Sequence, residues 1–161
     1  MNFQTMNKQR KFILIAAAIG ILAMFLPWIR FSFSGFIDSS INGMHDMGIL
    51  IFLCFVTAAI VATMGDQTKI LNKTMWMICL IAGGLAAAIM VIYLLRALDA
   101  ISFFSFGFYL ALIASLAVLY SAYTYRAAGY NIKDGFNSLK EDIEKKTKGD
   151  NTPPPPSSPT S

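Results

Sequence analysis

Charged side chains are scarce in this 161-residue chain, and its longest apolar runs contain none of them. Asp, Glu, Lys and Arg make up 14% of the residues, whereas a soluble globular domain carries about 25%. Four uncharged runs, 12–29, 47–64, 75–95 and 100–125, fill most of the chain. As a helix, each is long enough to cross a hydrocarbon core of about 30 Å. The sequence therefore predicts an all-α membrane protein, a bundle of four transmembrane helices.

The residues that usually carry membrane chemistry are also missing from these runs. No Asp, Glu, Lys, Arg or His lies inside a predicted span, which argues against a proton-coupled transporter, a pump or a haem protein. The two cysteines, Cys54 and Cys79, lie at depths that differ by about 15 Å at 1.5 Å per residue, too far apart for a disulfide. We therefore expect no cofactor, no catalytic residue and no enzymatic activity.

One short segment holds the only candidate metal ligands, Met44, His45 and Met47. Thioethers beside an imidazole suit a copper ion. A chain with one histidine and nine methionines also brings these residue types together by chance, and the segment then reads as an ordinary loop before a helix. We favour the loop and expect no metal site.

Basic residues are distributed unequally between the ends of the spans. The predicted cytoplasmic side carries eleven of the thirteen Lys and Arg residues, and the other side carries only Arg30 and Arg96. The positive-inside rule then predicts that both termini are cytoplasmic, with loops 30–46 and 96–105 facing outward. Trp28 and Trp76 are expected in outer and inner aromatic belts. We expect a bacterial inner membrane as the location.

Three regions follow from these patterns. Residues 1–11 are a polar lead, 12–129 form the transmembrane domain, and 130–161 form a cytoplasmic tail. The spans are expected at about 12–29, 47–64, 75–95 and 107–125, because residues 100–106 exceed what the fourth span needs. The tail is expected to be amphipathic to about residue 146, with an apolar face of Ile132, Phe136, Leu139 and Ile143, and disordered in its proline-rich end.

This amphipathic segment has two interpretations. It lies on the inner membrane surface or against the bundle, or it docks a cytoplasmic partner.

The outer loops also have two interpretations. Residues 29–34 alternate like a half-buried strand and resemble 101–106 in composition, so the two loops either pair as a cap or lie along the bilayer. Arg96 and Asp99 are expected to form an exposed outer ion pair that contributes little to stability.

Small residues at helical spacing form the most informative pattern inside the spans. Such pairs let helices approach closely in lipid. Their expected role is packing within one bundle or against another membrane-protein subunit, including a second copy. The predicted packing residues are Ala16, Gly20, Gly83, Gly84, Ala87, Ala88, Ala111 and Ser115.

Leu26-Pro27-Trp28 closes the first run, and Gly107-Phe108-Tyr109-Leu110 opens the predicted fourth span. In so short a chain, these segments resemble small uncharacterised bacterial four-helix transmembrane proteins over roughly residues 12–125. The resemblance implies an architecture and no activity.

The sequence thus predicts a structural or accessory membrane protein, with the lipid bilayer and other membrane subunits as partners and no nucleic acid. The alternative is a small channel or carrier for an uncharged or lipid-like solute. That function would need a continuous polar stripe, for which the available residues are Thr57, Thr63, Tyr93, Ser115 and Ser121.

Overall fold

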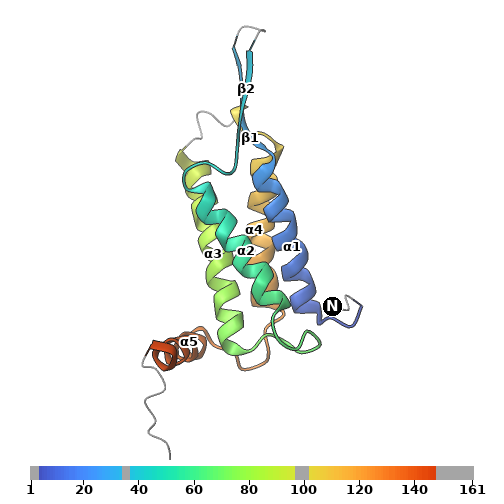
Figure 1. Ribbon diagram of the computed structural model, residues 1–161, viewed down its shortest axis with the longest axis vertical. Helices are drawn as coiled ribbons and strands as arrows, with labels where there is room; N and C mark the ends of the chain where they lie inside the picture. The colour runs from blue at the N-terminus through green and yellow to red at the C-terminus, as the bar shows by residue number, and fades with distance from the viewer. Residues whose placement is uncertain (1–3, 34–36, 97–101, 148–161) are drawn as a thin grey trace, which may run out of the picture.

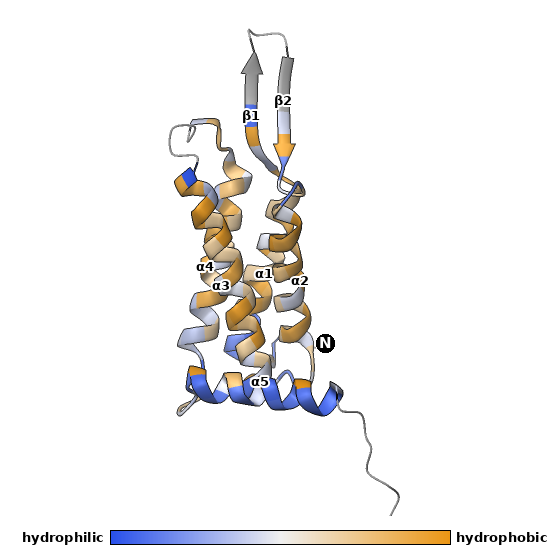
Figure 2. Ribbon diagram, turned by 90° about the vertical axis from the view of Figure 1, so that its left-hand side faces the viewer, coloured by the Kyte–Doolittle hydropathy of each residue, from blue (hydrophilic) through white to orange (hydrophobic). Residues whose placement is uncertain are grey.

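The computed structural model describes residues 4–33, 37–96 and 102–147, and this part of the chain is mostly helical. Four helices stand side by side, a β-hairpin projects from one end of the bundle, and a fifth helix lies across the other end (Figures 1 and 2). We name the two ends the hairpin end and the α5 end. The elements are α1 (Lys8–Phe25), β1 (Pro27–Phe33), β2 (Ile37–Asn42), α2 (Gly48–Thr63), α3 (Lys73–Arg96), α4 (Phe106–Thr124) and α5 (Ile132–Thr147).

The four long helices form a closed ring in which α1 and α3 each pack against both α2 and α4. Small residues make the close approaches. Gly20 on α1 faces the buried ring of Phe55 on α2, and a Cβ there would overlap the ring. A Cβ on Gly83 of α3 would lie 3.0 Å from the backbone nitrogen of Leu119 on α4. At these two glycines, the backbone of one helix therefore lies directly against a side chain or the backbone of its neighbour.

Two helices, α3 and α4, are long and apolar enough to cross a membrane by length and composition. The apolar helix α2 has 16 residues, and α1 begins with the basic residues Lys8, Arg10 and Lys11. The structure itself therefore identifies two candidate spans.

The expectation of an all-α fold is incomplete, because the chain also forms a hairpin. The helix of the first apolar run ends at Phe25, not Ile29, and the rest of that run enters β1. Pro27 explains the early end, since proline cannot donate to the helix and disfavours helical geometry in the residue before it. Leu26 accordingly has an extended ψ of 155°.

The strand predicted near residues 29–34 exists, but its partner differs from the one considered. β1 pairs antiparallel with β2, the next segment of the chain. In the described part of the second loop, 102–106, Phe104 forms an isolated bridge with Ile29. A short connection makes the hairpin the less costly pairing, because closing a long loop loses more chain entropy. Among the described residues, the two outer loops therefore meet at the base of the hairpin.

Both tryptophans are buried at the ends of the bundle instead of facing outward in aromatic belts. The indole of Trp28 donates to the carbonyl of Ala23 at 3.0 Å, and the indole of Trp76 donates to the carbonyl of Ala122 at 2.8 Å. Each indole thus binds the last turn of a helix, where carbonyls lack partners within the helix. Exposed aromatic residues at the α5 end include Tyr120, Tyr123 and Tyr125 on and just after α4, and Phe12, which stacks on Tyr125.

Candidate functional site

A charged side chain is buried at the α5 end. Arg10 is 3% exposed and donates to three carbonyl oxygens. Its Nε lies 2.8 Å from Lys69 O, and its Nη1 lies 2.6 Å from Met64 O and 3.3 Å from Ala62 O. Ala62 and Met64 close α2, so the cation lies at the negative end of that helix dipole. The guanidinium of an arginine remains charged at neutral pH.

Gln9, the neighbour of Arg10, is 1% exposed, and its side chain bonds to two distant parts of the chain. Its Nε2 donates to Ala122 O on α4 at 3.3 Å, and its Oε1 accepts from the backbone of Leu71 at 3.2 Å. The same Ala122 oxygen accepts from Trp76 on α3. We call Gln9, Arg10, Trp76 and these carbonyls the polar staple. It joins all four helices at one level.

The loop after α2 is shaped to present its carbonyls to Arg10. Asp66 accepts from the hydroxyl of Thr68 at 2.7 Å and from its backbone nitrogen at 3.1 Å, and it pairs with Lys69 at 3.3 Å. Donation by the Thr68 hydroxyl is the main reason that the pKa of Asp66 is lowered. Gly65 has a φ of +72°, which starts the turn. The turn holds Lys69 where its carbonyl meets Arg10.

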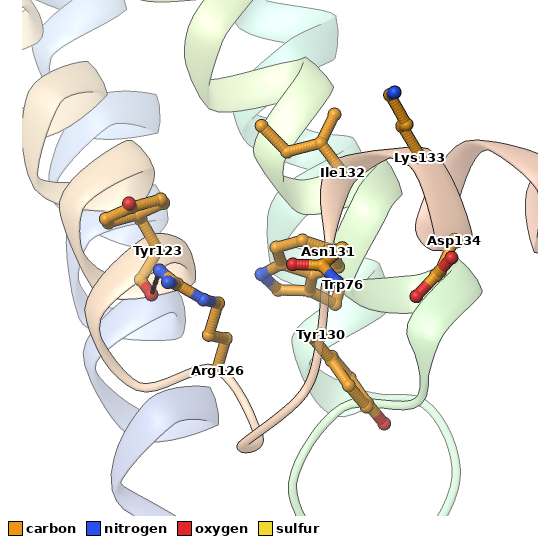
Figure 3. Close-up of a pocket in the computed structure, with 8 residues that line it drawn as sticks. All are labelled: Trp76, Tyr123, Arg126, Tyr130, Asn131, Ile132, Lys133 and Asp134. Atoms are coloured by element: carbon orange, nitrogen blue, oxygen red, sulfur yellow. Dashed lines mark hydrogen bonds between the residues drawn. The ribbon is translucent and has the colours of Figure 1, made fainter.

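A pocket of about 380 Å³ adjoins the staple and shares Trp76 with it. It opens between the end of α4, the connecting segment and the start of α5 (Figure 3). Tyr123 and Arg126 form one side of the pocket, and Trp76, Asn131 and Ile132 form the other (Figure 3). The pocket thus combines aromatic and aliphatic walls with one guanidinium.

Arg126 is held in place by its own side of the pocket. The guanidinium carbon lies 4.0 Å from the centre of the Tyr123 ring, and Nη1 donates to Tyr123 O at 3.0 Å. Stacking on a ring and bonding to a carbonyl fix the plane of the guanidinium. A planar cation of this kind can bind an anion through two parallel hydrogen bonds.

The packing residues inferred from sequence divide into two groups. Ala16, Gly20, Gly83, Ala87, Ala111 and Ser115 are buried within the bundle. Ala88 is exposed and Gly84 half-exposed, and a Cβ on Gly84 would meet only Leu119 Cδ1, at 3.8 Å. The first group is used between the helices of this chain, and the second is left on the surface of α3.

The other candidate residues lie at or near the hairpin end. His45 Nδ1 lies 3.1 Å from Asn42 Oδ1, Met44 packs against the core, and Met47 is exposed. Within the described segments, no three His, Cys, Asp or Glu residues gather as a metal site would require. Arg96 ends α3, whereas Asp99 and the proline-rich tail lie outside the described residues.

The residues considered for a polar stripe are separated from one another. Thr57 is exposed on the outside of α2. The Thr63 hydroxyl donates to Ile60 O at 2.8 Å, and the Ser115 hydroxyl donates to Leu112 O at 2.8 Å, each within its own helix. Ser121 is buried and Tyr93 half-buried. The hydroxyls of Thr63 and Ser115 therefore bond to carbonyls of their own helices instead of lining a shared polar path.

Sequence reasoning missed Gln9, Arg10 and Arg126 as site residues. It treated both arginines only as markers of orientation and placed Gln9 in an unremarkable lead. A signal was available for the first two, because a Gln-Arg pair immediately before an apolar run enters the first turn of a helix at the bundle's end. No such signal marks Arg126, whose setting depends on how the chain turns after α4.

No protein-family model, no curated protein and no solved structure matches this chain.

Proposed function

We propose that this chain is an integral membrane protein whose four long helices all cross the bilayer and which packs as an accessory subunit against other membrane proteins. The observation that carries the first part is the surface of the bundle. Large apolar side chains are exposed on each of the four long helices. A soluble monomer, in contrast, rarely exposes a contiguous apolar patch of more than a few hundred Å². Examples from successive helices are Leu22, Leu53, Leu95 and Ile113.

The two shorter apolar segments are compatible with this arrangement. The flanking residues Met47 and Met64 extend the uncharged segment of α2 to 47–64, which is about 27 Å long as a helix. The basic residues of α1 lie in its first turns, and there Lys8 can reach the headgroups while Arg10 is satisfied inside the protein. Four spans with more basic residues at the α5 end support cytoplasmic termini in a bacterial inner membrane.

Labelling of introduced cysteines in intact cells tests this placement. Ser40 in β2 and Thr68 in the loop after α2 are both exposed, and the two native cysteines are buried. A membrane-impermeant maleimide should label Ser40→Cys in intact cells and Thr68→Cys only after lysis. Equal labelling of both variants in intact cells would contradict the proposed orientation.

The second part of the proposal rests on the small residues that the bundle itself does not use. Gly84 and Ala88 lie one turn apart on α3, and the exposed side chains of Ile81, Leu85 and Ile92 surround them. A small-residue surface flanked by larger apolar side chains lets another helix approach closely in lipid. We propose that a transmembrane helix of a second subunit packs here.

A pair of matched substitutions tests the packing surface. Gly84→Leu should reduce co-purification of the partner in mild detergent without lowering thermal stability, because a Cβ on the half-exposed Gly84 meets only Leu119 Cδ1, at an ordinary contact distance of 3.8 Å. The control is Ala18→Leu, which places the same side chain on the exposed face of α1. Retention of every native partner by Gly84→Leu, at the level seen with the control, would refute this surface as the interface.

The tail helix fits the same arrangement. α5 lies across the α5 end of the bundle (Figure 2) and attaches through Gly135, which packs on Trp76, and through Asp142, which accepts from Thr74 at 2.7 Å. Ile132, Phe136 and Ile143 remain exposed. We propose that this apolar face lies on the cytoplasmic surface of the bilayer, as in other interfacial helices.

A further inference from the structure

The pocket between α4 and α5 contains a cation whose charge the protein does not neutralise. In the described parts of the chain, the ion pairs are Lys69–Asp66 and Lys140–Glu144, and neither includes Arg126. The pocket lining also contains Lys133 and Asp134, so its net formal charge is +1 (two cations minus one anion). In Figure 3, Lys133 and Asp134 lie beyond Asn131, whereas Arg126 and Tyr123 lie on the opposite side. The exposed charge of the pocket is therefore positive around Arg126.

Arg126 is also pre-organised to bind a planar or tetrahedral oxyanion. A guanidinium has five N–H donors, and one bond, from Nη1 to Tyr123 O, is shown here. The stack on Tyr123 limits rotation of the group. Binding an anion at this position therefore orders little that is not already ordered, which is the condition for a favourable charge-assisted bond.

An apolar stripe on α4 leads away from this cation. Ile113, Leu116, Tyr120 and Tyr123 are all exposed and follow one another at intervals of three, four and three residues, so they share one face of the helix. The stripe runs from the middle of α4 to the wall of the pocket. Ile132, which is also exposed, lines the pocket on the α5 side. A ligand with an acidic head and an extended apolar chain matches both parts.

We propose that this pocket binds the phosphate of an anionic phospholipid, with Arg126 bonding the phosphate oxygens and the α4 stripe contacting an acyl chain. This lipid-phosphate site rests on the proposed bilayer placement, because the pocket then lies at the depth of the cytoplasmic headgroups. The volume of about 380 Å³ falls within the range of small-ligand pockets. Because aromatic walls exclude water from one side of the phosphate, they strengthen its attraction to the guanidinium.

Native mass spectrometry of the full-length protein in detergent tests the site. The probes are dioleoyl phosphatidic acid, dioleoyl phosphatidylcholine and inorganic phosphate, each titrated separately. We expect phosphatidic acid to bind most tightly. Arg126→Gln should weaken that binding by about tenfold or more, since it removes hydrogen bonds to a charged group. Lys145→Gln is the matched control, because it removes one cation from the last turn of α5, away from the pocket.

Two further variants keep the test decisive. Arg126→Lys retains the charge without the fork and should recover part of the affinity. Leu116→Gln should weaken binding of phosphatidic acid while leaving Arg126 intact. The inference is overturned if Arg126→Gln and Lys145→Gln bind phosphatidic acid equally, or if inorganic phosphate binds as tightly as the lipid. If the variants lose lipid selectivity but still fractionate with membranes, the site is supported and the bilayer placement is unaffected. Recovery of wild-type protein in the soluble fraction would refute the placement itself.

Discussion

Replacing Arg10 with alanine should destabilise the protein far more than its position near the N-terminus indicates. The substitution removes the three hydrogen bonds to Ala62, Met64 and Lys69. Those to Met64 and Lys69 are short, at 2.6 and 2.8 Å, and a hydrogen bond to a charged group contributes about 1.5–3 kcal/mol. Two such bonds give an upper value of about 3–6 kcal/mol.

Water reduces this figure, because Met64 and Lys69 are themselves exposed and their freed carbonyls can be hydrated. We therefore expect Arg10→Ala to lower the free energy of unfolding by about 2–3 kcal/mol. Arg10→Lys should lose roughly half as much, since an ammonium can reach fewer of the three carbonyls than a fork does.

The assay is equilibrium unfolding in mixed detergent micelles followed by circular dichroism. Lys8→Ala is the matched control, because it removes the same charge from the same segment while Lys8 is exposed. If Arg10 acted only as a positive charge that helps to orient the protein in the membrane, both substitutions would change the free energy of unfolding to the same extent. If Arg10→Ala and Lys8→Ala have free energies of unfolding within about 0.5 kcal/mol of each other, the polar staple does not stabilise the fold.

Three other predictions concern close packing and pH. Gly83→Ala should destabilise the protein by about 1–3 kcal/mol, because its Cβ would press on the α4 backbone, while Gly84→Ala should be neutral in the same equilibrium unfolding assay. Gly135→Leu should release α5 from Trp76, measured as faster amide exchange in α5; unchanged protection would contradict the contact. The lowered pKa of Asp66 means that its contribution is present above the unfolded value of about 3.9 and is lost as pH falls through the folded pKa. Asp66→Asn should remove this pH dependence of unfolding, and an unaltered profile would argue against the turn.

The helical elements were predictable from sequence, and their ends show which local rules decide the boundaries. The uncharged runs contain α2, α4 and most of α3, and these stretches are continuously apolar enough to form helices and contain neither proline nor a charged side chain that would interrupt one. Pro27 is visible in the sequence, and its effect on the end of α1 follows from its missing N–H. The hairpin was predictable only in part. The alternation of apolar and polar residues indicated β1, but it did not indicate that β2 would be the pairing partner of that strand.

The site was largely hidden from sequence because it depends on contacts between distant residues. Arg10 meets carbonyls more than fifty positions away, and Gln9 meets Ala122, 113 positions away. Backbone oxygens have no sequence signature, so no residue type at positions 62, 64 or 122 indicates that an acceptor lies there. The division between Gly83 and Gly84 was equally inaccessible, because adjacent glycines differ only in what the neighbouring helix presents to them.

The separation in sequence of the staple's partners has a consequence for how the protein assembles. The side chain of Arg10 is synthesised first, yet its acceptors emerge only after α2 and its following loop. Gln9 finds its acceptor later still, because Ala122 lies near the end of α4, the last of the four long helices. The start of α1 therefore remains unsatisfied until the last long helix arrives. The first turn of α1 therefore reaches its full set of hydrogen bonds only when the bundle is complete. A chain truncated before Ala122 leaves the buried pair Gln9 and Arg10 without all its partners.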